Sequence, residues 1–87
     1  MLRNKEIKIA ALKGKDEVEF TFCFSTKSAQ ILANGLIQDG FQTVFVNDEE
    51  GGECLAYKRK KGRIEIEEIS KEEARLEIKA RHEIQAA

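Results

Sequence analysis

The sequence predicts an α+β fold, a two-layer sandwich in which a mainly antiparallel five-stranded sheet carries two helices on one face. Residues 17–24 alternate apolar and other side chains, as a half-buried strand does. Residues 26–39 repeat apolar side chains at helical spacing, and residues 41–46 return to a strand composition. A strand, a helix and a second strand in succession require the helix to cover a sheet. The whole chain predicts the order ββαβββα.

The strand over residues 17–24 is rich in phenylalanine. Phe20, Phe22 and Phe24 alternate with Thr21 and Cys23, so the three rings share one face. We expect that face to point inward and to pack beneath Leu32 and Leu36 of the following helix.

The first helix has clear end signals. Ser25 or Thr26 is the expected N-cap, and Gly40 the expected residue just after the C-cap. Gly35 lies in the helix interior at a cost of about 1 kcal/mol relative to alanine. We interpret it as a point of close packing between helix and sheet, with a ligand contact as the alternative.

The other strands follow from alternation and turn residues. A strand at Lys5–Leu12 and the connection Gly14–Asp16 predict a hairpin with the phenylalanine strand. The strands that flank the first helix should point the same way, with Phe41 or Val44 meeting its apolar stripe. A second hairpin joins strands Glu53–Lys60 and Arg63–Glu67 through Lys61-Gly62, with Ile64 and Ile66 inward.

The last helix runs from Lys71 to about Gln85. Ser70 and Glu73 form a capping box, and Ile69 can contact Ala74 as a hydrophobic staple. Its apolar stripe is narrow, with Ala74 and Ile78 at the margin. We therefore expect part of the sheet to be thinly covered, so that a partner or a second copy completes the core. The residues of the stripe itself are Leu76, Ala80 and Ile84.

Composition indicates one small domain over residues 1–87, with a net charge of −1 that supplies no general attraction for nucleic acid or anionic membrane. Cys23 and Cys54 lie too far apart in sequence for a zinc motif, and we expect free thiols in strands, with a disulfide or reactive thiol as the alternative. The N-terminus lacks the apolar run of a signal peptide, so we expect a cytoplasmic protein. His82, the only histidine, has no catalytic partner nearby in sequence.

The most pronounced surface feature is a basic hairpin tip. Its five cations could neutralise phosphates, and the neighbouring tyrosine could stack on a base. The alternatives are an acidic protein partner, or a solvated tip in which Glu65 and Glu67 pair with the lysines and the charges protect a sheet edge. The residues of this candidate contact are Tyr57, Lys58, Arg59, Lys60, Lys61 and Arg63.

A second candidate contact is an acidic turn beside the same strand. It lacks the spacing of a calcium loop, so we expect no metal and interpret it as a solvated turn. Together with the basic tip it would give the molecule a polar asymmetry that orients protein docking. Its residues are Asp48, Glu49, Glu50 and Glu53.

From Thr26 onward, the order αβββα resembles that of double-stranded-RNA-binding domains. That family opens its second helix with Lys-Lys-x-Ala-Lys, whereas residues 71–75 here read Lys-Glu-Glu-Ala-Arg. Its strand-connecting loop usually carries Gly-Pro-x-His, whereas residues 48–52 here are acidic and glycine-rich. The strand–helix–strand unit is equally similar to half of a ferredoxin-like fold.

No motif for catalysis or for a cofactor is visible. We therefore expect a small non-enzymatic protein-binding module that acts as an inhibitor, an adaptor or an oligomer subunit, including a homodimer. Nucleic-acid binding through Tyr57–Arg63 is the alternative. No cofactor and no membrane partner is expected.

Overall fold

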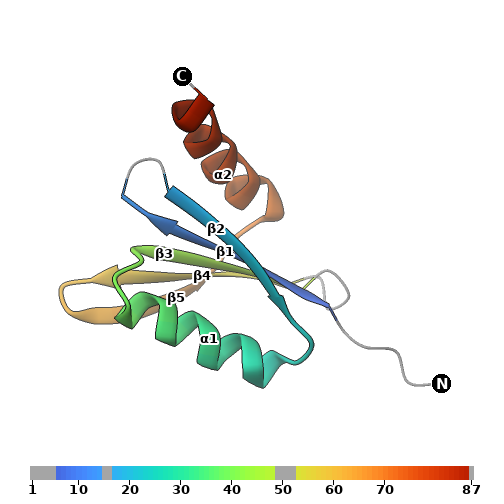
Figure 1. The fold of residues 1–87 in the computed structure, drawn as a ribbon. Helices are drawn as coiled ribbons and strands as arrows, with labels where there is room; N and C mark the ends of the chain where they lie inside the picture. The colour runs from blue at the N-terminus through green and yellow to red at the C-terminus, as the bar shows by residue number, and fades with distance from the viewer. Residues whose placement is uncertain (1–5, 15–16, 49–52, 87) are drawn as a thin grey trace.

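The computed structural model describes residues 6–14, 17–48 and 53–86 (Figure 1). The strands are β1 (Ile7–Lys13), β2 (Glu17–Cys23), β3 (Thr43–Asp48), β4 (Glu53–Lys60) and β5 (Arg63–Glu68). The helices are α1 (Thr26–Gln38) and α2 (Lys71–Ala86). The predicted order ββαβββα is confirmed.

The five strands form one sheet in the order β2-β1-β3-β4-β5, and every neighbouring pair is antiparallel. Since β2 and β3 both run antiparallel to the strand between them, they point the same way, as expected for strands that flank a helix. The two edges of the sheet are β2 and β5. Consequently β1, β3 and β4 are interior strands.

The expectation that both helices lie on one face is wrong. Ala33 and Ile37 of α1 pack on Ile9, Val44 and Tyr57. On the other side, Ala74 of α2 belongs to a separate cluster, with Ile78 packed against it. The alternate strand positions Ala10, Leu12, Phe45 and Ala56 form that second cluster. The sheet therefore lies between the two helices (Figure 1).

The physical reason is that the interior strands are apolar on both sides. Residues 9–12 of β1 are all buried, and so are residues 44–46 of β3. An interior strand that buries consecutive side chains needs cover on both faces of its sheet. One helix cannot cover both faces of the sheet.

Both ends of α1 are capped as expected. Ser25 Oγ accepts a hydrogen bond from the Ser28 backbone N–H at 3.1 Å, and the N–H of Asp39 closes α1 on the Gly35 carbonyl at 2.9 Å. Gly40 follows with φ of 111°, a conformation that favours glycine.

At the start of α2, Ser70 Oγ accepts from the Glu73 N–H at 3.1 Å, and Ile69 joins Ala74 in one apolar cluster. The hydroxyl half of the capping box and the hydrophobic staple are therefore confirmed.

The turn of the second hairpin is also as predicted. Lys61 and Gly62 both have positive φ, 50° and 76°. Two such residues between antiparallel strands are typical of a type I′ turn, whose twist matches that of the strands. The turn places Lys60 opposite Arg63 and fixes the register of β4 on β5.

Three expectations about single positions are wrong. Nothing lies within 4 Å of a Cβ added at Gly35, so this glycine is not a point of close packing. Leu76 is 65% exposed, because α2 turns Ala74 and Ile78 to the sheet in its place. Ile66 lies on an edge strand and is exposed as well.

Candidate functional site

Phe20 and Phe22 of β2, and Phe24 just after it, do not point inward. Phe20, Phe22 and Phe24 are 59%, 57% and 56% exposed. Phe20 lies opposite Ala10 and Phe22 opposite Lys8, positions on the α2 face of the sheet. Leu32 and Leu36 belong to α1 and pack on the opposite face of the sheet. The alternation correctly predicted that the rings share a face. That face lies towards α2, however, and not towards α1.

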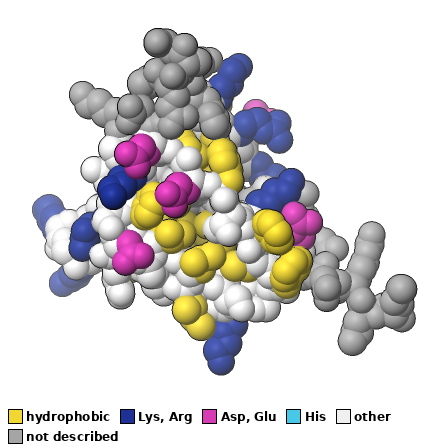
Figure 2. Space-filling model, viewed as in Figure 1, with side chains coloured by type: hydrophobic (Ala, Val, Ile, Leu, Met, Phe, Trp, Pro, Cys, Tyr) yellow, Lys and Arg dark blue, Asp and Glu magenta, His cyan; other side chains and the backbone are white. Residues whose placement is uncertain are grey.

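The exposed rings lie at one edge of the sheet, and two of them are in contact. The rings of Phe22 and Phe24 meet edge to face, with centroids 5.5 Å apart. Figure 2 shows apolar side chains on this side of the molecule, with acidic and basic side chains among and beside them. Exposed apolar side chains that share one face are a candidate binding surface.

The two edges of the sheet differ sharply in chemistry. β2 carries no lysine, arginine or proline between Glu17 and Cys23, and its charges are two glutamates on the α1 side. In β5, four of the six side chains are charged. Charged side chains protect an edge against pairing with another chain, and an edge with fewer of them is more open to it. Of the two edges, β2 is therefore the one suited to accept a further strand.

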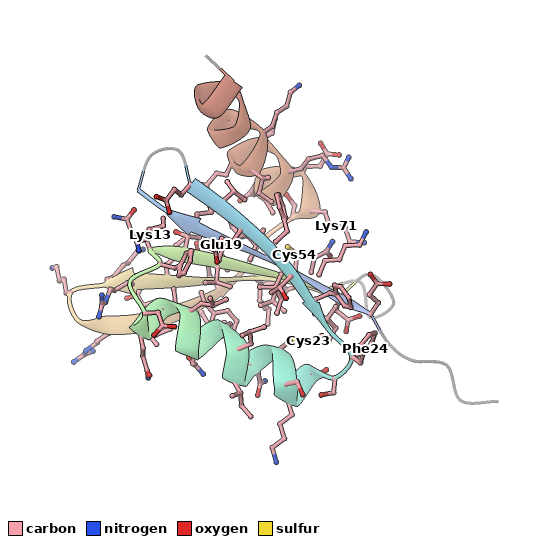
Figure 3. The ribbon with its side chains drawn as sticks, in the orientation of Figure 1. Lys13, Glu19, Cys23, Phe24, Cys54 and Lys71 are labelled. Carbon is pink, nitrogen blue, oxygen red and sulfur yellow. The ribbon has the colours of Figure 1, made fainter. Side chains whose placement is uncertain are left out.

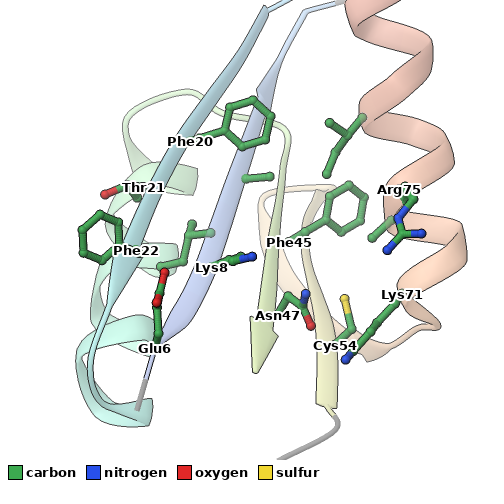
Figure 4. A pocket seen from close by; sticks show the side chains of 14 residues that line it. Glu6, Lys8, Phe20, Thr21, Phe22, Phe45, Asn47, Cys54, Lys71 and Arg75 are labelled. Carbon is green, nitrogen blue, oxygen red and sulfur yellow. The ribbon is translucent and has the colours of Figure 1, made fainter. Parts of the chain in front are cut away.

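Beside the phenylalanines lies a groove of about 540 Å³ between β2 and α2 (Figure 4). Ala10 and Phe45 contribute to its apolar floor, and Ile78 of α2 lines it on the helix side. A groove of this volume can hold several side chains of a partner.

The end of the groove nearest the start of α2 is polar and basic. Lys8, Lys71 and Arg75 line the groove, with Glu6 as the acidic side chain among the lining residues described (Figure 4). The excess of positive charge favours a partner that brings a carboxylate.

Two uncharged polar side chains complete this end of the groove. Asn47 lies between Lys8 and Cys54 across three neighbouring strands. Its Oδ1 is buried and accepts no hydrogen bond from the described residues. Burial raises the pKa of the Cys54 thiol, and the nearby charge of Lys71 opposes that shift only in part. The thiol is thus protonated at neutral pH, which disfavours a nucleophilic role.

The two cysteines are free thiols, as expected. Cys23 packs with the cluster beneath α1, and Cys54 with the cluster beneath α2 (Figure 3). Because the sheet separates them, they cannot form a disulfide with each other without rearrangement.

The basic hairpin differs from its sequence interpretation in two respects. Tyr57 is only 1% exposed and packs in the core beneath α1, so stacking of this ring on a base is wrong. Lys58 pairs with Glu67 at 2.7 Å and Lys60 with Glu65 at 3.4 Å, the pairing that a solvated tip predicts. The remaining cations, Arg59, Lys61 and Arg63, are exposed.

The acidic turn is described only in part. Asp48 ends β3 and is buried, at 8% exposure, so this carboxylate is not part of an open acidic surface. Glu49, Glu50 and the side chain of Glu53 lie outside the described residues. Within the described part of the chain, no three metal-ligating side chains come together.

Sequence reasoning missed the groove, because the groove depends on which face α2 covers. One signal was present: Lys8 interrupts the apolar run of β1 at a position that shares a face with Phe22. A charged residue on an interior strand needs an opening to solvent or a partner.

Comparison with known proteins found no matching family model, no similar characterised protein and no similar solved structure. Neither described helix is long and apolar enough to cross a membrane.

Proposed function

We propose that this protein is a small non-enzymatic binding module that docks another polypeptide at the β2 edge. The observation that carries the proposal is the exposure of Phe20 and Phe22 on edge strand β2, and of Phe24 just after it, on a face to which β2 contributes no charged side chain. Strand addition at such an edge is compatible with an inhibitor, an adaptor or an oligomer subunit.

Strand addition is the mode of recognition that this surface suits. The outer side of an edge strand offers unpaired backbone N–H and C=O groups, which hydrogen-bond to an incoming strand. The phenylalanine rings then contact alternate side chains of that strand on the α2 face. Backbone pairing would supply affinity, and the rings would select apolar side chains.

The test compares equally exposed positions on different surfaces. Phe20→Ser and Phe22→Ser together should remove captured polypeptides from a lysate of the native host. Ile31→Ser on α1, which replaces a side chain of 65% exposure, is the matched control and should retain them. Quantitative mass spectrometry of the captured material reads out the difference. Equal capture by both variants would overturn the proposal.

The alternative, nucleic-acid contact by the hairpin, now rests on Arg59, Lys61 and Arg63, because the two lysines are paired with glutamates. If it holds, reversing these three charges should abolish binding to labelled single-stranded and duplex oligonucleotides. Phosphate contacts are strongest at low salt, so absence of binding by the unaltered protein at about 50 mM salt would eliminate this alternative.

A further inference from the structure

We propose that the strand which β2 receives is β2 of a second copy of this chain, so that two sheets join into one across a twofold axis. This inference rests on the proposed docking role of the β2 edge. A twofold interface requires a surface that complements itself, and the sequence of β2 meets that requirement in antiparallel register.

The register that pairs all seven residues of β2 is centred on Phe20. In antiparallel pairs, directly opposite side chains lie on the same face. On the α2 face, Phe20 would meet Phe20 of the partner subunit, and Phe22 would meet Val18 of the partner subunit. Every side chain that meets across the axis on this face is apolar.

The opposite face avoids contact between like charges. Glu19 would lie opposite Thr21 of the partner subunit, and Glu17 opposite Cys23 of the partner subunit. A register centred on Glu19 would instead place two glutamates face to face, which is destabilising. The alternation of β2 therefore separates its apolar contacts and its charges onto different faces of the joined sheet.

The second copy would also extend the partly covered core. Val18 packs with the cluster beneath α2, to which Ile78 also belongs. Phe22 of the partner subunit would add a ring beside that cluster. The three exposed rings offer on the order of 300 Å² of apolar surface per copy, against about 800 Å² per partner in a stable interface. Backbone pairing and neighbouring side chains must supply the rest, which predicts an association that depends on concentration.

Disulfide trapping tests both the edge and the register. Phe20→Cys, made with Cys23→Ser, should give a covalent dimer under mild oxidation, because residue 20 would face its own copy across the axis. Phe22→Cys in the same background is the register control, since the two residues 22 would lie four positions apart along the strands, about 13 Å. Ile31→Cys is the surface control, with similar exposure on α1. We expect at least tenfold more dimer from Phe20→Cys than from either control.

Sedimentation measures the same association without a crosslink. The unaltered protein should shift from monomer to dimer across a hundredfold range of concentration, and Phe20→Glu should remain monomeric with an unchanged circular dichroism spectrum. Phe20 is 59% exposed, so its replacement should not prevent folding. Ile31→Glu should dimerise like the unaltered protein.

Each remaining outcome contradicts a defined part of the inference. A dimer that traps faster through residue 22 than through residue 20 overturns the register. A monomer at every concentration, with no trapping, overturns self-pairing. In that case the proposed function still stands if capture from lysate depends on Phe20 and Phe22, so the two failures can be told apart.

Discussion

At the scale of single residues, apolar side chains at different positions contribute very different amounts to the free energy of unfolding. Leu12 is 0% exposed in the cluster beneath α2, whereas Phe22 is 57% exposed on the edge strand. Removing a buried leucine side chain loses both its transfer free energy and the contacts around the cavity that it leaves. Removing an exposed ring loses little transfer free energy and leaves no cavity.

We therefore predict that Leu12→Ala lowers the free energy of unfolding by about 3 kcal/mol. Phe22→Ala should lower it by less than about 1 kcal/mol, although it removes more atoms. Urea unfolding followed by circular dichroism measures both, at a concentration low enough to keep the chain monomeric. Equal losses would show that Phe22 is part of the folding core.

The thiol of Cys54 provides a second prediction at this scale. Burial raises its pKa, so at pH 8 less of it is thiolate than in a free cysteine, and access by reagents is restricted. We expect iodoacetamide to modify Cys23, which is half-buried, well before Cys54 in the folded protein. In urea the two should react at similar rates. Rapid modification of Cys54 in the native state would contradict its burial beneath α2.

At the scale of elements, α2 is held by few apolar contacts. Among its residues with described side chains, Ala74 is buried and Ile78 half-buried, while Leu76 is exposed. Local features at its start therefore matter more than they do for α1, which buries Ala29, Ala33 and Ile37. The Ser70 hydroxyl is such a feature.

We predict that Ser70→Ala destabilises α2 by about 1 kcal/mol, because the Glu73 N–H loses its acceptor. Hydrogen exchange should show faster opening of α2 with little change in β1 and β3. Ser70→Asp, which keeps an acceptor oxygen, should restore protection. If Ser70→Ala leaves exchange in α2 unchanged, the cap is not what stabilises its first turn.

The β4–β5 hairpin predicts a pH dependence. The hydrogen bond and charge of Lys58 lower the pKa of the Glu67 carboxyl, and the same contact raises the pKa of Lys58. The contribution of Glu67 to the stability of the folded protein is therefore present above its unfolded pKa. It is lost as pH falls through its lower folded pKa. The contribution of Lys58 to the stability of the folded protein is present below its unfolded pKa and is lost as pH rises through its raised folded pKa.

Glu67→Gln should accordingly flatten the loss of thermal stability between about pH 5 and pH 3. Because Glu67 is solvent-exposed, the change should be small and should shrink in high salt. Glu72→Gln on α2 is the control, because Glu72 makes no ion pair with the described part of the chain. A steeper acid transition in Glu67→Gln would contradict this sign.

At the scale of the whole molecule, local patterns predicted the elements but not the faces. Alternation and turn residues identified β4 and the Lys61-Gly62 turn within their observed bounds. The inward placement of Phe20 failed because alternation shows which side chains share a face, not which helix covers it. That choice depends on the position of β2 at the sheet edge, which is set by pairing between segments distant in sequence.

The site was predictable to a similar degree. The sequence identified Lys58 and Lys60 as surface cations, and also the glutamates that could pair with them. It could not show that Tyr57 is buried, because Cys54–Tyr57 is apolar on both sides of β4 and suits either face. The groove beside α2 arises from packing alone, so single residues such as Lys8 gave only an indirect indication of it.

The charged side chains of β5 have a consequence for the size of any assembly. If both edges accepted strands, copies could add head to tail without limit and form fibrils. Here one edge is available and the other carries Arg63, Glu65, Glu67 and Glu68. Growth would stop once two available edges have met, so a closed pair and a soluble particle of fixed size are expected in place of a filament.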